Sequence, residues 1–185
     1  PVLVKGAPNR EGARYDIEGR LRRGRNGPGW ATPRRDEVLR DLRQEKLLPA
    51  IHFIFSRAGC DEARDGLLRA GMNLNDGRES AEVDVRVDRR LAGVPVGDLE
   101  ALDVYRWREG LRRGIAAHHA GLLPLFKEIT EDLFAAGLLK IVYATETLAL
   151  GVNLPARSVV IDKLTKFTGE SHEGLTAGQF AQLTG

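Results

Sequence analysis

The chain has little cysteine, almost no excess charge of either sign and no long apolar run, and each shortage excludes a class of protein. A single cysteine, Cys60, excludes an internal disulfide framework and a multi-cysteine zinc site. The chain has 28 Lys and Arg residues and 26 Asp and Glu residues. The resulting net charge of +2 does not mark the whole chain as a nucleic-acid binder. No apolar run approaches the roughly 18 residues that span a bilayer. No charged-then-apolar leader opens the chain, so we expect a cytoplasmic protein without a membrane partner.

The basic residues are concentrated at the start of the chain. Residues 1–35 hold nine Lys or Arg and three Asp or Glu, whereas the remainder holds 19 and 23. The same stretch is rich in Gly and Pro and has little apolar surface to bury, so it cannot offset the entropy cost of ordering it. We predict a basic linker or loop over 1–33, with a short strand at 1–5, and one domain over 34–185. The arginines of the linker either contact phosphates or are solvated.

From residue 34 onward, apolar runs of strand length alternate with amphipathic segments of helix length. Near-continuous apolar strands that alternate with helices are typical of a parallel sheet covered on both faces. The pattern therefore predicts an α/β fold. The predicted strands are 50–55, 115–118, 139–144 and 159–161; the predicted helices are 34–47, 59–70, 77–92, 97–113, 123–137 and 176–183; and a hairpin or loop is predicted over 162–174.

Polar segments follow three of the predicted strands, at 56–59, 119–121 and 145–147. Ligands of parallel sheets bind where the strands end, so these segments are expected to share one rim. The run 141–157 carries the strongest signal, because an apolar strand leads directly into hydroxyl groups and the start of a short helix. Hydroxyls and backbone N–H groups at a helix start suit a phosphate.

Other candidate chemistry has a simpler structural explanation. The chain contains no phosphate loop of the form G-x-x-x-x-G-K-S/T, and Asp36-Glu37 opens a helix instead of ending a strand, which is ordinary helix-dipole complementation. His118 and His119 are predicted to point to opposite faces of a strand, one buried and one at the rim, and no third ligand stands at metal-binding spacing. We predict no metal site, a structural role for Cys60, and a solvated helix face that carries Glu128, Glu131 and Asp132.

Three segments resemble motifs of one family: Phe53-Ile54-Phe55-Ser56-Arg57, then Ala117-His118-His119-Ala120-Gly121-Leu122-Leu123-Pro124, then 144–155. They are similar in order and spacing to the Ski-type (Mtr-like) DExH-box helicases of superfamily 2, especially the bacterial HelY-type branch. The resemblance covers 34–185 and implies the second of two RecA-like motor domains. Segment 72–113 would be a helical insertion, and 1–33 would occupy the position of the interdomain linker.

The resemblance also implies a role for each matching residue. The nucleic-acid side would comprise Ser56, Arg57, Gly121, Thr145, Glu146 and Thr147. The ATP side would comprise Gly151, Asn153, Gln182 and Gly185. The implied cofactors are ATP and Mg²⁺, held mainly by the first motor domain. The implied partners are single-stranded RNA, with DNA as the alternative, and the first RecA-like domain of the same protein. Lys163, Lys166 and Phe167 would sit on a hairpin that either steers the strand or is a plain sheet edge.

The implied function is that of the C-terminal motor domain of an ATP-dependent RNA helicase. Such a motor unwinds or moves along a single strand by ATP-gated closure of its two domains. The resemblance implies that the chain stops at the start of motif VI, before the arginines that stabilise the transition state, and that it contains no catalytic residue of its own. We therefore expect the chain alone to be inactive as an ATPase. The alternative is a non-catalytic nucleic-acid-binding scaffold domain that keeps a degenerate helicase fold.

Overall fold

The computed structural model describes residues 3–4, 7–8, 33–95, 97, 99, 103–149, 155–167 and 172–184. The chain separates into two compact units, Pro1–Leu39 and Arg40–Gly185, with the boundary inside helix α2 (Arg35–Gln44). In the first unit, strands β1 (Leu3–Val4) and β2 (Ala7–Pro8) pair in antiparallel orientation. The short strand predicted at 1–5 is therefore present, and its partner falls in the segment predicted to be linker or loop.

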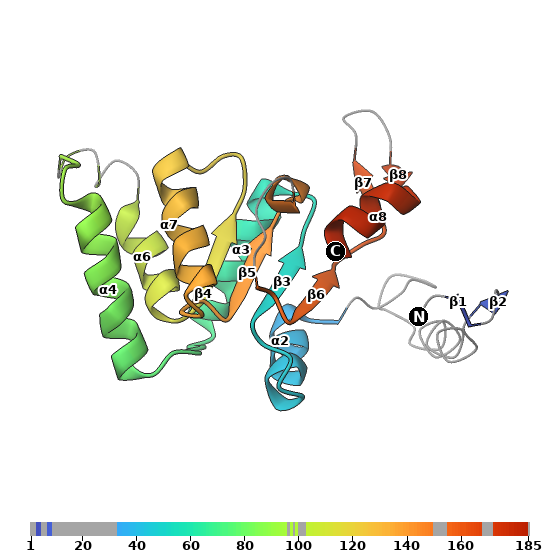
Figure 1. The fold of residues 1–185 in the computed structure, drawn as a ribbon, viewed down its shortest axis with the longest axis horizontal. Helices are drawn as coiled ribbons and strands as arrows, with labels where there is room; N and C mark the ends of the chain where they lie inside the picture. The colour runs from blue at the N-terminus through green and yellow to red at the C-terminus, as the bar shows by residue number, and fades with distance from the viewer. Residues whose placement is uncertain are drawn as a thin grey trace. The chain divides into compact units, whose positions relative to one another are not determined.

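A four-stranded parallel sheet forms the centre of the second unit (Figure 1). Its strands are β3 (Ala50–Phe53), β4 (Ile115–His118), β5 (Ile141–Ala144) and β6 (Ser158–Ile161), in the order β4-β5-β3-β6. Every residue of β3, β4 and β5 is buried, which explains why their sequences are apolar almost without interruption. The predicted α/β fold is confirmed, and the sheet is consistent with a RecA-like domain.

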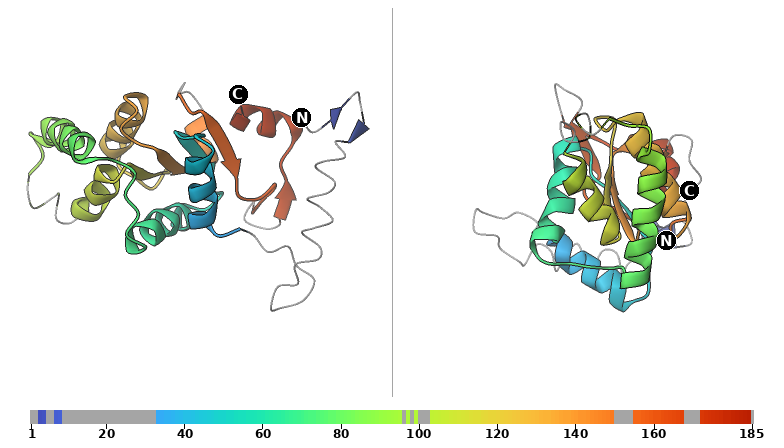
Figure 2. Two further views of the ribbon diagram at one scale, coloured as in Figure 1. Left: turned by 90° about the horizontal axis from the view of Figure 1, so that it is seen from below. Right: turned by 90° about the vertical axis from the view of Figure 1, so that its left-hand side faces the viewer.

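Helices cover both faces of this sheet. Helix α3 lies on one face and α7 on the other, while α6 packs beside the edge strand β4 and α4 packs on α6 (Figure 2). A short 3₁₀ helix, η1, follows β5, and the predicted hairpin after β6 is present as strands β7 and β8. The bounds are α3 (Arg57–Arg69), α4 (Gly77–Leu91), α6 (Val104–Arg112), α7 (Pro124–Ala135), η1 (Glu146–Ala149), β7 (Thr165–Phe167), β8 (His172–Gly174) and α8 (Ala177–Thr184).

The hydrophobic core joins one face of the sheet to α4, α6 and α7. Trp107 of α6 stacks on Phe126 of α7, with ring centroids 4.3 Å apart, and both side chains are at least 96% buried. Full burial of a large apolar side chain contributes about 1.5–3 kcal/mol. This pair therefore anchors the two helices that flank β4, the strand that leads into one loop of the site described below.

Glycine allows α6 to approach β4 closely. A Cβ atom at Gly110 would lie 2.7 Å from the carbonyl oxygen of Ile115 and 3.2 Å from Cδ of Arg64. At Gly114, which has a φ of +74°, a Cβ would lie 2.7 Å from Oδ1 of Asn75. The Asn75 amide in turn donates to the carbonyl oxygens of Arg112 and Leu138. These contacts fix the turn that starts β4.

Two helix boundaries differ from the sequence prediction. The helix predicted over 97–113 is interrupted. Gly97 and Leu99 are helical, but Asp103 has a left-handed φ of 50° that a continuous helix does not allow, and α6 begins at Val104. The helix predicted over 34–47 ends at Gln44, and Lys46, with a φ of 57°, turns the chain out of the helix. Among the described residues, no helix has the length and apolar character needed to cross a membrane.

Candidate nucleic-acid interface

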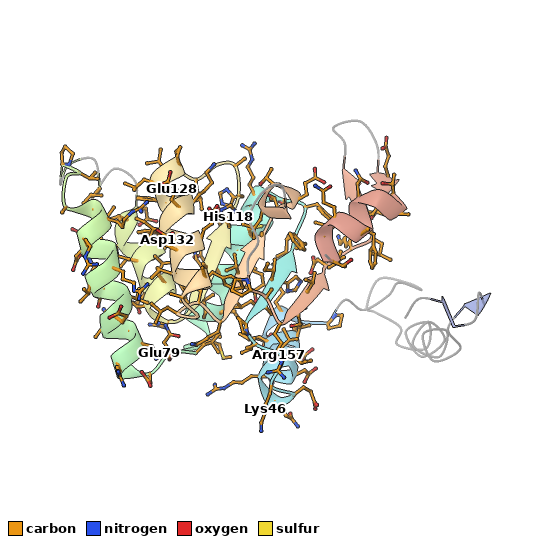
Figure 3. All side chains as sticks on the ribbon, in the orientation of Figure 1. Lys46, Glu79, His118, Glu128, Asp132 and Arg157 are labelled. Carbon is orange, nitrogen blue, oxygen red and sulfur yellow. The ribbon has the colours of Figure 1, made fainter. Side chains whose placement is uncertain are left out.

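The hydrogen-bond ladder of the sheet continues past the strands and aligns the loops that follow them. Thr145 N–H donates to the carbonyl oxygen of His118 (3.2 Å), and Ile54 N–H donates to that of Ala144 (2.8 Å). On the outer side, Asp162 N–H donates to the carbonyl oxygen of Phe53 (3.0 Å). The loops after β4, β5 and β3 thus start side by side. We call residues 54–57, 119–121 and 145–147 the rim. It lies at the end of the sheet marked by His118 in Figure 3, opposite the end marked by Arg157.

The first rim segment ends β3 and starts α3. Ser56 is the N-cap of α3, in an extended conformation, and its hydroxyl oxygen accepts a hydrogen bond from Gly59 N–H (3.1 Å). Arg57 is the first residue of the helix and is exposed. No described carboxylate forms an ion pair with its guanidinium group. The segment therefore presents an uncompensated positive charge at a helix N-terminus, where the helix dipole is also positive.

The second rim segment lies against the first. A Cβ atom at Gly121 would lie 3.5 Å from Cδ of Arg57 and 3.0 Å from Nδ1 of His119. Gly121 itself is exposed. The absence of a side chain thus keeps the backbone of the β4 loop open beside the aliphatic stem of Arg57, and a long polymer can approach the backbone there.

Both adjacent histidines are buried, which corrects the prediction that one of them faces the rim. The two side chains do point to opposite faces of the sheet, as predicted, because His119 meets α3 and His118 meets α7. His119 turns inward, where its Nδ1 accepts a hydrogen bond from Gly121 N–H (3.1 Å) and its Nε2 lies 3.0 Å from Oδ2 of Asp61. Asp61 comes from α3, so His119 ties the second rim segment to the helix that follows the first.

His118 points to the other face of the sheet and meets α7. Its Nε2 lies 2.7 Å from Oε1 of Glu131. Burial lowers the pKa of His118, and the hydrogen bond and charge of Glu131 oppose this only in part. The prediction that Glu131 belongs to a solvated face is therefore wrong: Glu131 is half-buried against His118. Glu128 and Asp132 are exposed but bind Arg90 of α4, at 2.7 and 3.2 Å. Within the described residues, no group of three His, Cys, Asp or Glu side chains is arranged to hold a metal ion.

The third rim segment presents two hydroxyl groups. The Oγ1 atoms of Thr145 and Thr147 are 3.0 Å apart, and one donates to the other. Thr147 is exposed, whereas Thr145 and Glu146 are half-buried. Leu148, 2% exposed, anchors η1 in the core, and its N–H donates to the Thr145 carbonyl oxygen (3.2 Å). The predicted transition from a buried strand to a helix start is therefore present.

Of the predicted ATP-side residues, Gln182 alone lies within the described part of the chain. Gly151, Asn153 and Gly185 lie outside the described residues. Gln182 is exposed on α8, while the next residue, Leu183, is buried in the core and holds α8 against η1. Lys163 is exposed beyond β6, and the side chains of Lys166 and Phe167 lie outside the described part of the chain.

Sequence reasoning missed the polar residues behind the rim. Asp61, Arg64 and Asp65 share α3, and Arg64 pairs with both carboxylates at 3.1 and 2.8 Å. The spacing of Asp61 and Arg64, three residues apart, would have indicated a helical ion pair. No local pattern indicates that the partner of Asp61 is His119, 58 residues later. Cys60, as predicted, is structural: it is fully buried in the first turn of α3, and its thiol lies 3.5 Å from the Ile54 carbonyl oxygen.

No protein-family model matches the chain. Individual proteins do. "Probable helicase HelY" of Mycobacterium tuberculosis is 53% identical over 165 residues, which is 89% of this chain and 18% of that protein. "Superkiller complex protein 2" of Homo sapiens is 40% identical over 148 residues, 80% of this chain and 12% of that protein. "DExH-box ATP-dependent RNA helicase DExH11" of Arabidopsis thaliana is 40% identical over 148 residues, 80% of this chain and 11% of that protein.

The chain spans less than a fifth of the length of these curated relatives. Each match nevertheless covers at least four-fifths of this chain. It confirms the resemblance that the three motif segments indicated. The chain is thus homologous to one segment of the HelY and Ski2-type DExH-box helicases.

Proposed function

We propose that the chain is the C-terminal RecA-like motor domain of an ATP-dependent RNA helicase and that the rim binds the backbone of single-stranded nucleic acid. The observation that carries this proposal is the meeting of Arg57, Gly121 and the Thr145–Thr147 hydroxyl pair along one edge of the sheet. The names of the relatives support a helicase as the whole protein.

The chemistry of the rim suits a polyphosphate backbone. A guanidinium group binds phosphate oxygens through parallel hydrogen bonds, and the charge of Arg57 is not neutralised by a described carboxylate. Threonine hydroxyls donate to phosphate oxygens, and a glycine allows the ligand to approach closely. None of these groups reads a base edge, so we expect binding that depends little on sequence and strongly on salt.

The ATP side of the proposal rests on the resemblance. Gly151, Asn153, Gln182 and Gly185 would face the nucleotide, and the first RecA-like domain would hold most of the ATP and Mg²⁺. Closure of the two domains on the nucleotide would then tighten the rim on the strand. RNA is the proposed substrate because one relative is named as an RNA helicase. Single-stranded DNA is the alternative substrate, and the cytoplasm is the proposed location.

The rim can be tested by the fluorescence anisotropy of labelled single-stranded RNA and DNA oligonucleotides on this chain. Arg57→Gln should weaken binding about five- to tenfold and reduce the salt slope by about 0.7, the value for one lost phosphate contact. Arg69→Gln is the matched control, because Arg69 is an exposed arginine in the last turn of the same helix. It should change affinity less than twofold. Equal effects of the two substitutions would contradict a specific rim.

The proposed motor function can be tested by measuring ATP hydrolysis by the longest natural protein, with this chain as the negative control, called the blank below. We expect RNA to stimulate ATP hydrolysis in the long protein and no turnover in the blank. Thr145→Ala in the long protein should reduce this stimulation, because it removes one hydroxyl of the pair. Unchanged stimulation would refute the role of Thr145. RNA binding without ATP turnover in the long protein would favour the scaffold alternative.

A further inference from the structure

The most constrained polar side chain behind the rim is His119. It is 4% exposed, and both ring nitrogens are engaged: Nδ1 with Gly121 N–H at 3.1 Å and Nε2 with Asp61 Oδ2 at 3.0 Å. A backbone N–H can only donate, so Nδ1 must be the unprotonated nitrogen. The proton of the neutral ring is therefore on Nε2 and is donated to Asp61. The two hydrogen bonds together define one tautomer and one ring orientation.

This arrangement has a direct consequence for the rim. The amide of Gly121 is turned inward to His119 and is not directed at a ligand. What the β4 loop offers a strand is then its exposed backbone surface beside Arg57, not a hydrogen bond from Gly121. A Cβ atom added at Gly121 would lie 3.0 Å from the His119 ring and 3.5 Å from the Arg57 stem. Because these three groups are so close together, the position of each depends on the other two.

Asp61 is itself held in place. Its Oδ1 pairs with Arg64 at 3.1 Å, so both carboxylate oxygens are engaged. Arg64, whose side chain is 9% exposed, also pairs with Asp65 at 2.8 Å, and Asp65 pairs with Arg106 of α6 at 2.8 Å. Hydrogen-bonded charges in such a network restrain one another. The ring of His119 is therefore attached to two helices and not only to its own loop.

We propose that His119 is a positioning residue of the rim. It does not touch the strand; instead it fixes Gly121 against Arg57 so that the two loops bind the backbone as one surface. This inference rests on the proposed function of the rim for its binding readout, although the tautomer and the loop geometry are independent of that function.

Two conservative substitutions separate the two hydrogen bonds of His119. In His119→Asn the side-chain oxygen takes the place of Nδ1, so the bond from Gly121 is kept and the bond to Asp61 is lost. In His119→Gln the amide nitrogen takes the place of Nε2, so the bond to Asp61 is kept and Gly121 is released. Each variant loses one buried hydrogen bond, so their losses of stability in urea unfolding should be similar.

Binding of the labelled oligonucleotide should differ between the two variants. We expect His119→Asn to stay within twofold of the unsubstituted chain and His119→Gln to bind at least fivefold more weakly. Equal weakening of both variants would reveal a merely structural role and overturn the proposal. So would an affinity of His119→Gln that equals that of the unsubstituted chain.

Nitrogen NMR of the imidazole gives a readout that needs no nucleic acid. We expect Nε2 to be protonated, Nδ1 to be unprotonated, and the Gly121 amide to be protected from hydrogen exchange although its residue is exposed. A proton on Nδ1, or a Gly121 amide that exchanges as fast as a free one, would overturn the proposal. If the unsubstituted chain bound no oligonucleotide, the proposed function would fail, and these spectra would still decide whether His119 holds the loop.

Discussion

Alanine at Gly110 should destabilise the chain, although alanine normally favours a helix. Replacing a helical glycine by alanine gains about 1 kcal/mol from backbone entropy. At Gly110, however, the new Cβ would meet the carbonyl oxygen of Ile115 at 2.7 Å, and backbone atoms cannot move aside as a flexible side chain can. Overpacking of this kind costs about 1–3 kcal/mol. We expect a net loss of up to about 2 kcal/mol, because the cost exceeds the gain.

Gly66 provides the matched control for this substitution. It lies near the C-terminal end of α3, as Gly110 does in α6, and a Cβ there would meet only the tip of Arg69, at 4.0 Å. Gly66→Ala should therefore stabilise the chain by about 1 kcal/mol. Urea unfolding of both variants, with an unchanged denaturant slope, measures the difference directly. If Gly110→Ala stabilised the chain as much as Gly66→Ala, the claim that glycine sets the distance from α6 to β4 would be wrong.

Three further predictions concern residues around the rim. The pKa of His118 is lowered by burial, so the unfolded chain takes up a proton below about pH 6.5 that the folded chain does not, and stability should fall as the pH drops below that value. His118→Gln should flatten the fall in urea midpoints between pH 7 and 5; parallel curves would contradict this. Ser56→Ala should cost about 1 kcal/mol in the same assay and Ser56→Gly only a few tenths, because glycine is itself a favoured N-cap residue and alanine is not. Leu148→Ala should cost about 2–5 kcal/mol by leaving a cavity under η1, and an unchanged midpoint would show that η1 is not anchored there.

The strands were predictable because burial on both faces leaves a local signature. Residues 50–53, 115–118 and 141–144 are apolar almost throughout, so the sequence alone indicated an α/β fold with a parallel sheet. The three polar segments of the rim were predictable for the same reason, since each directly follows one of these strands. Their functional roles came from the motif resemblance and stay predictions.

The supporting contacts were not predictable, because they join residues that are distant in the sequence. His119 points to the opposite face from His118, as expected, but it was also expected to face the rim, and its contact with Asp61 buries it instead. Glu131 was assigned to a solvated face because it lies away from the apolar stripe of its own helix. Its partner, His118, lies on strand β4, and the stripe gives no information about that contact. Helix periodicity reports which face is apolar, not which polar group finds a buried partner.

The strand order of the sheet sets a sequence of events during synthesis on the ribosome. Ile115 of β4 pairs with Ile141 of β5, 26 positions later, and only α7 lies between the two strands. Ala50 of β3 pairs with the same Ile141, 91 positions later, and with Ser158. β3 and α3 therefore emerge long before any strand exists for β3 to pair with, and the unit from β4 to β5 is the first part of the sheet that can form. The nascent chain must hold an apolar strand unpaired while the next 91 residues are made, which makes β3 the segment that a chaperone would most usefully shield.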